Sequence, residues 1–104
     1  MTLRLTEEDE EIDALDEAAY IMGSRYRTVV VADLAEKPTT PSQIANRHEI
    51  AISHVSRALS ELSERGIVQA HSGESRTKLY SLTEVGNEVA EIVRDLDDGG
   101  EDDD

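Results

Sequence analysis

The stretch Ser42–Gly66 has the pattern of two short helices joined by a turn. Just before it, Thr40 is a suitable N-cap, and Pro41 fits the first position of a helix, where its missing N–H costs nothing. Gln43 follows the cap at the spacing of a capping box, so its side chain can bond back to the cap residue. We expect this first helix to end near Arg47.

A longer helix is expected from Ile52 to Arg65, and Gly66 suits its end because glycine readily adopts a positive φ. One side of this helix is apolar at helical spacing and consists of Ile52, Val55, Leu59 and Leu62. The opposite side carries Ser53, Arg57, Ser60 and Glu64, with His54 and Ser56 at its margins. Short side chains let a helix approach DNA closely, and a long donor reaches a guanine edge or a phosphate. The same pattern also fits an ordinary amphipathic helix with a solvated face.

Two further helices are predicted ahead of this unit. Thr6 is a suitable N-cap followed by carboxylates, which favour the positive end of a helix, so the first is expected over residues 7–22. Its apolar positions are Ile12, Leu15, Ala19 and Met22. Ser24 can cap a second helix over residues 25–36. Three consecutive valines there would suit a strand, but the cap and a proline beyond the end favour a helix.

Two strands are predicted after the central unit, over residues 67–71 and 77–82, with a short polar turn between them. Thr83 is then a suitable cap for a last helix over residues 84–96. The apolar positions of this helix, spaced as in a helix-pairing seam, are Val85, Val89, Ile92 and Leu96. Residues 97–104 hold carboxylates and glycines but no hydrophobic side chain, so we expect a disordered acidic tail. The fold class predicted is α+β, mostly helical, with one domain over residues 1–96.

Length and composition exclude several classes of protein. A chain of 104 residues can form one small core, and the lack of Cys excludes disulfides and thiolate metal sites. No apolar run approaches a membrane span and the N-terminus is too acidic for a signal peptide, so we expect a soluble cytoplasmic protein. His48, His54 and His71 share no i, i+4 face, so no metal site is expected. No nucleophile–base pair or phosphate loop is evident, so we expect no enzyme and no cofactor.

The formal net charge of −14 is distributed unevenly along the chain. Residues 1–19 hold one basic and eight acidic side chains, and residues 81–104 hold one basic and ten acidic. Residues 20–80 hold eight basic and six acidic side chains, a net charge of +2. Only two residues are Lys, and Phe and Trp are absent, a profile typical of halophilic archaea. A mesophilic protein with acidic tails is the alternative, but the scarcity of Lys favours the halophile.

In this order, the segments resemble the winged helix-turn-helix transcription regulators of the MarR/ArsR kind, especially short haloarchaeal ones. The resemblance spans roughly residues 20–90 and rests on Met22–Arg27, Ser42–Ala45, Ile52–Leu59 and Lys78–Thr83, followed by Gly86. It implies that the predicted strands form a two-stranded wing. It also implies that the first and last helices flank the DNA-binding unit.

The resemblance assigns the candidate DNA-binding residues to three elements. They are Ser42, Gln43 and Arg47 on the first short helix, Ser53, His54, Ser56 and Arg57 on the recognition helix, and Arg76 and Lys78 on the wing. Each assignment has a structural alternative. Arg57 can pair with Glu61 four residues on, Gln43 can be occupied by capping, and the hairpin can be simply solvated. Arg25 and Arg27 are weaker candidates for phosphate contacts.

The function expected from the sequence is a sequence-specific transcription regulator that binds double-stranded DNA as a homodimer. The residues expected to join the two protomers are Ile12, Leu15, Ala19, Val85, Val89, Ile92 and Leu96. The rival function is a winged-helix protein-interaction module without significant affinity for DNA. The acidic arms fit that rival, and a central charge of only +2 does not separate the two.

Overall fold

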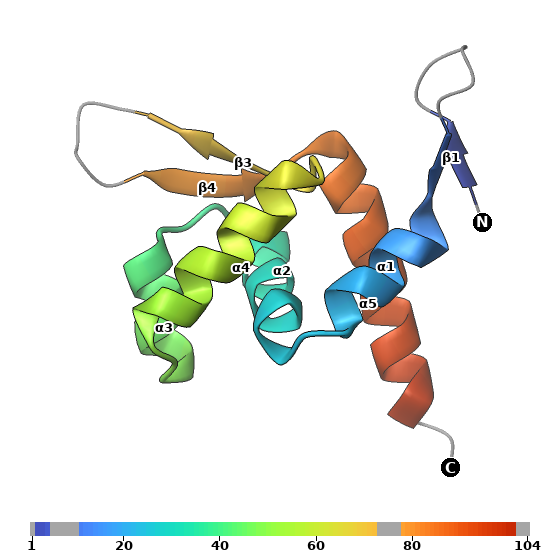
Figure 1. Ribbon diagram of the computed structural model, residues 1–104. Coiled ribbons are helices and arrows are strands. Elements are labelled where there is room, and N and C mark those ends of the chain that lie inside the picture. The colour runs from blue at the N-terminus through green and yellow to red at the C-terminus, as the bar shows by residue number, and fades with distance from the viewer. Residues whose placement is uncertain (1, 5–10, 73–77, 102–104) are drawn as a thin grey trace.

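The computed structural model describes residues 2–4, 11–72 and 78–101. Its elements are β1 (Thr2–Arg4), β2 (Glu11–Asp13), α1 (Ala14–Met22), α2 (Arg25–Glu36), α3 (Pro41–His48), α4 (Ile52–Glu64), β3 (Val68–His71), β4 (Leu79–Leu82) and α5 (Glu84–Glu101). Helices α1 and α5 pack together on one side of the domain, α3 and α4 lie on the other, and the β3–β4 hairpin extends outward (Figure 1). The predicted α+β, mostly helical fold is confirmed.

The predicted pair of short helices is present as α3 and α4. Thr40 caps α3, because its side-chain oxygen accepts the amide N–H of Gln43 at 3.3 Å. Glu49 takes the left-handed conformation, with φ 57° and ψ 49°, and so turns the chain between the two helices. Gly66 has φ 75° just beyond α4, as its place at the end of the predicted helix requires. Ser24 likewise caps α2 by accepting the amide N–H of Arg27 at 3.2 Å.

The core forms where α2 packs against α4 (Figure 1). Its buried apolar side chains are Ala18, Ile21, Val30, Val31, Leu34, Ile44, Ala45, Val55, Ala58, Leu59, Leu62, Ile67, Val68, Leu82, Val89, Ala90 and Val93. Three of the four apolar positions predicted for α4 belong to it. The prediction for the fourth, Ile52, is wrong, because its side chain is 50% exposed while that of Val55 is fully buried. Ile52 is the first residue of α4 and lies before the turn that meets the core.

The wing is a two-stranded antiparallel hairpin in which Val68 pairs with Leu82 and His71 pairs with Leu79. The segment before α3 adds a single bridge to it. Thr39 donates its amide N–H to the carbonyl of Tyr80 at 3.1 Å and accepts the amide N–H of Tyr80 at 2.9 Å. The wing and the start of α3 are therefore tied together at their bases, a connection that no local pattern in the sequence indicates.

The N-terminal helix is shorter than predicted. Glu11–Asp13 forms a strand against Thr2–Arg4, and α1 begins only at Ala14. Asp13 is the cap, since its carboxylate accepts the amide N–H groups of Leu15 and Asp16 at 3.2 and 3.4 Å. The predicted cap, Thr6, lies outside the described residues. Strand pairing accounts for the later start, because it satisfies the backbone groups of residues 11–13.

The last helix is longer than predicted, since α5 continues to Glu101 instead of ending at Leu96. The expectation of a disordered tail is therefore wrong for residues 97–101, and residues 102–104 lie outside the described part. Carboxylates and glycines lower helix propensity by only about 1 kcal/mol each relative to alanine, so a helix already formed can continue through them. Among the described residues, no helix combines the length and the apolar character needed to cross a membrane.

Gly86 sets how closely α5 approaches the start of the wing. A Cβ atom at this position would lie 2.0 Å from the carbonyl oxygen of Ile67. Thr83 fixes the same junction from its other side, because its hydroxyl donates to the carbonyl of Gly66 at 2.6 Å and accepts the amide N–H of Gly86 at 2.9 Å. The predicted cap Thr83 is thereby confirmed, and it also joins α5 to the end of α4.

Candidate nucleic-acid interface

The outer face of α4 is polar and open to solvent. Ser53, Ser56, Arg57 and Ser60 are all exposed, on the side of the helix away from the buried row that starts at Val55. The Arg57 side chain is 77% exposed. A helix that presents hydroxyls and one long cation can hydrogen-bond to base edges and phosphates in a DNA groove.

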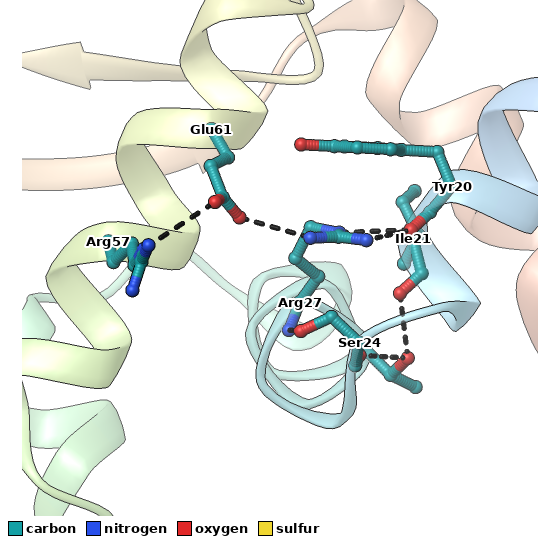
Figure 2. A network of polar contacts seen from close by, with 7 residues as sticks. Tyr20, Ile21, Ser24, Arg27, Arg57 and Glu61 are labelled. Carbon is teal, nitrogen blue, oxygen red and sulfur yellow. Dashed lines mark hydrogen bonds and ion pairs between the residues drawn. The ribbon is translucent and has the colours of Figure 1, made fainter.

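Arg57 also has an intramolecular partner. Its Nε lies 3.7 Å from Oε2 of Glu61, one turn further along α4 (Figure 2). The structural alternative predicted for Arg57 is therefore present. Because Arg57 stays largely exposed, this ion pair is weak and leaves the guanidinium accessible to a ligand.

Glu61 has a second cation on its inner side. Nη1 of Arg27 donates to Oε1 of Glu61 at 3.1 Å, and Nε and Nη2 of Arg27 donate to the carbonyl of Tyr20 at 2.9 and 2.6 Å (Figure 2). The Arg27 guanidinium also lies 3.8 Å from the centre of the Tyr20 ring. The suggested phosphate contact for Arg27 is wrong, because this side chain is only 16% exposed and its donors are occupied inside the protein.

His54, a predicted groove-facing residue, lies flat against Tyr26 of α2. The two ring centroids are 4.3 Å apart and the planes differ by 4°. The guanidinium of Arg25 lies 5.7 Å from the centre of the Tyr26 ring. A shallow hollow of about 260 Å³ lies beside this pair, lined by Ser24, Tyr26, Arg27, His54, Arg57, Ala58 and Glu61. The sequence did not indicate Tyr26 as part of the site, because its stacking on His54 depends on how α2 packs against α4.

The basic end of α3 is tied to α2 by Asp33, a buried carboxylate. Its two oxygens lie 2.9 Å from Nη1 of Arg47 and 2.8 Å from Nε2 of His48. Arg47 is still partly exposed, so it can orient a free edge of its guanidinium outward. Burial of a carboxylate is favourable only with such partners, so Asp33 fixes α3 on the core.

The remaining candidates on α3 and the wing differ in how accessible their side chains are. Ser42 is exposed, whereas the side-chain oxygen of Gln43 accepts a hydrogen bond from Thr39 at 2.7 Å, so Gln43 neither completes the capping box nor is fully free. Lys78 is exposed at the outer end of β4, next to the turn of the wing, and Arg76 lies outside the described residues.

The histidines do not converge. His71 lies 2.7 Å from the hydroxyl of Ser81 across the wing, far from the contacts of His48 and His54. Within the part of the chain that the structure describes, no group of three His, Cys, Asp or Glu side chains can hold a metal ion.

The residues predicted to join two protomers fall into two groups. Val89 is fully buried in its own chain, and Val85 and Ile92 are partly buried against the same core. Leu15, Ala19 and Leu96 are exposed, and Ile12 lies in β2 rather than in a helix. The predicted role of Val89 in a seam between protomers is therefore wrong, because α5 packs on its own α1 and α2 along that row.

Comparison with known protein families identifies the family of this chain. The family described as HVO_A0261 N-terminal domain matches residues 15–103. The chain belongs to this family. The matched residues of this HVO_A0261 N-terminal domain include α1 to α5 almost completely, so the family covers both the candidate interface and the flanking helices. The match is consistent with the haloarchaeal origin expected from composition. No curated protein matches the chain.

Solved structures similar to this HVO_A0261 N-terminal domain share its fold. ZitR from Lactococcus lactis aligns with a TM-score of 0.69 and 23% identity, over 95% of this chain and 62% of its own. The MarR family regulator NMB1585 from Neisseria meningitidis aligns with a TM-score of 0.68 and 23% identity, over 85% of this chain and 68% of its own. The transcriptional regulator YodB from B. subtilis aligns with a TM-score of 0.70 and 20% identity, over 81% of this chain and 85% of its own. These likenesses confirm the predicted winged helix-turn-helix fold.

Proposed function

We propose that this protein is a regulator of transcription that binds specific sequences of double-stranded DNA as a homodimer. The observation that carries the proposal is the outer face of α4, where three serines and a largely exposed arginine lie opposite the buried row. In helix-turn-helix proteins the second helix enters the major groove with such a face. The fold shared with the regulators NMB1585 and YodB supports the same assignment.

The other contacts follow from how α4 is held. Ser42 and Arg47 on α3 are placed to meet the phosphate backbone beside the groove, since the first helix of such a pair crosses the backbone. Lys78 on the wing, with Arg76 beyond the described residues, is proposed to meet a flanking phosphate or minor groove. The structure offers no arrangement suited to catalysis among these groups, and we do not propose an enzyme.

The dimer is proposed to form through the exposed apolar side chains of α1 and α5. Leu15 and Met22 on α1 and Leu96 on α5 are large hydrophobic residues that remain open to solvent. Two protomers joined by a twofold axis would place two α4 helices on half-sites about one DNA turn apart.

One observation favours the rival, a module that binds a protein rather than DNA. Arg27, Arg47 and Arg65 are each paired with a carboxylate of the same chain. Three of the eight cations of the central region are thus engaged within the protein, and phosphate contacts supply most of the affinity of ordinary DNA binders.

Selection from a pool of random duplexes separates the two functions. The full chain is incubated with the pool in molar KCl, the ionic strength that the halophilic composition favours, and bound duplexes are amplified and sequenced over several rounds. DNA regulation predicts enrichment of a pseudo-palindrome with half-sites about one turn apart. A folded protein that enriches no sequence supports the interaction module and contradicts our proposal.

A further inference from the structure

Glu61 lies between two arginines that belong to different environments (Figure 2). On its inner side is Arg27 of α2, at 3.1 Å and 16% exposed. On its outer side is Arg57 of α4, at 3.7 Å and 77% exposed. One carboxylate of intermediate exposure is therefore shared between a cation of the interior and a cation of the candidate DNA face.

The inner contact is held firmly. Arg27 is fixed by its two hydrogen bonds to the Tyr20 carbonyl and by the Tyr20 ring, which stacks against its guanidinium (Figure 2). The guanidinium carbon of Arg65 lies 3.6 Å from the centre of the same ring. Nη1 of Arg65 also forms an ion pair with Oε1 of Glu17 in α1 at 2.9 Å. The hydrogen bond to Glu17 raises the pKa of Arg65. The Glu61 carboxylate is consequently held on its inner side by Arg27 of α2, which is itself fixed to Tyr20 of α1.

The outer contact is the one that a ligand can displace. It is longer, it is exposed to solvent, and it costs little to break. A DNA phosphate would compete with Glu61 for Arg57, because both are anionic oxygen groups that accept from a guanidinium. The pair with Glu61 limits the directions in which the Arg57 side chain points, while the guanidinium stays open to a ligand.

We propose that Glu61 is a positioning residue that makes Arg57 selective for a base edge. The proposal rests on the DNA-binding function proposed above. The printed ion pair uses only Nε of Arg57, so its terminal nitrogens can meet a base edge while the pair holds, whereas a phosphate that turns the guanidinium away must break the pair. Glu61 therefore lowers affinity for arbitrary duplexes more than affinity for the preferred one.

The test is a double-mutant cycle with Glu61→Gln, Arg57→Ala and the combined variant. Glutamine keeps an oxygen acceptor for Arg27 but has no charge to hold Arg57. The probes are a duplex selected by the wild-type protein and a scrambled duplex of equal composition, both in molar KCl. We expect Glu61→Gln to raise affinity for the scrambled duplex about two- to fivefold and to reduce the preference for the selected duplex by a similar factor. In the Arg57→Ala background, Glu61→Gln should change neither.

Glu64→Gln is the matched control, because it removes one exposed carboxylate from the same helix. If it raises scrambled binding as much as Glu61→Gln, the effect is one of net charge and the inference is overturned. The same holds if the effect of Glu61→Gln survives without Arg57, since Glu61 then acts only by joining α2 to α4. If Glu61→Gln does not fold, Glu61→Met, with a side chain of similar length, takes its place with the same expected outcomes.

Two failures remain distinguishable. A wild-type protein that shows no preference among duplexes removes the proposed function, and this inference with it. A wild-type protein that discriminates between duplexes, with a Glu61→Gln variant that discriminates equally well, overturns the inference alone.

Discussion

Arg57 is the most exposed arginine among the ion pairs that the structure describes. We expect Arg57→Ala to weaken binding to the selected duplex by about 1–3 kcal/mol if the side chain contacts a base. Folding should change little, since surface substitutions of this kind usually alter stability by less than about 0.5 kcal/mol. Fluorescence anisotropy with the selected duplex measures the first effect and thermal unfolding the second.

Arg94→Ala provides the control, because Arg94 is an exposed arginine on α5, far along the chain from the candidate interface. It should leave affinity for the selected duplex within about twofold of wild type, as expected for a distant site with no shared partners. Equal losses for the two variants would mean that Arg57 acts only through net charge.

Ile52 and Val55 have opposite roles although both are apolar residues in the first turn of α4. Val55→Ala removes a fully buried side chain and should cost about 2 kcal/mol of the free energy of unfolding. Ile52→Ala removes a half-exposed one and should cost clearly less, below about 1 kcal/mol. Chemical denaturation of the two variants measures the difference. Equal losses would indicate that Ile52 is buried in solution, against a partner protomer or elsewhere.

Patterns of neighbouring residues predicted the helix caps but not the ion pairs between residues far apart in the sequence. Ser24, Thr40 and Thr83 were predictable because a cap depends only on residues within one turn. The pair Arg57–Glu61 was predictable for the same reason, as a contact between i and i+4. The pair Arg27–Glu61 joins positions 34 residues apart, so it depends on how α2 packs against α4, which no local pattern encodes.

Among the helices and strands, the sequence predicted the middle of the chain well and its ends poorly. Between Ser24 and Thr83, capping residues mark the starts of α2, α3 and α5, and Gly66 follows α4. Helices α2, α3 and α4 lie within one or two residues of their predicted bounds. The acidic ends lack such signals. The start of α1 was misplaced because the pairing of Glu11–Asp13 with Thr2–Arg4 is a tertiary choice, and the end of α5 because no strong breaker follows Leu96.

Helix α5 supplies a matched pair of substitutions that tests the dimer. Val89 and Leu96 are one heptad apart, but the first is fully buried and the second is 48% exposed. Leu96→Asp should therefore convert a dimer to a folded monomer, because it places a charge on the exposed apolar surface. Val89→Asp should unfold the domain, because it buries an unpaired charge at a cost of several kcal/mol. Sedimentation and circular dichroism distinguish the two results.

A wild-type protein that sediments as a monomer at micromolar concentration would contradict the proposed dimer directly. A Leu96→Asp variant that remains dimeric would instead move the contact to another surface, for example the row of Leu15 and Met22 on α1.

For the molecule as a whole, the distribution of charge governs how DNA binding depends on salt. For ordinary basic proteins, the logarithm of the DNA-binding constant falls with the logarithm of the salt concentration, with a slope of about −0.9 for each phosphate neutralised. In this chain many cations are paired internally and the arms are acidic. We expect affinity for the selected duplex to persist in molar KCl and to change only weakly between about 0.1 and 2 M, because salt screens repulsion from the arms. A steep fall in affinity while the protein stays folded would contradict this.

Removal of residues 102–104 isolates the contribution of one acidic end. These three carboxylates follow the last described residue of α5, so their deletion leaves every described element intact. Binding of the selected duplex should improve at low salt and be unchanged in molar KCl, where repulsion over more than about 3 Å is screened. Titrations of the full and shortened chains at both salt concentrations make the comparison. Equal gains at both would show that the tail obstructs the site sterically.

The bridge between Thr39 and Tyr80 bears on the spacing of the DNA contacts that we propose. It joins the segment that leads into α3 to β4 of the wing, and Thr39 is almost fully buried there. The root of the wing therefore cannot hinge independently of the two helices beside it. In the proposed complex, the distance from the base pairs beneath α4 to the flank reached by the hairpin would therefore be fixed by the fold. An operator with one base pair inserted between those two contacts would have to deform, because the protein would not.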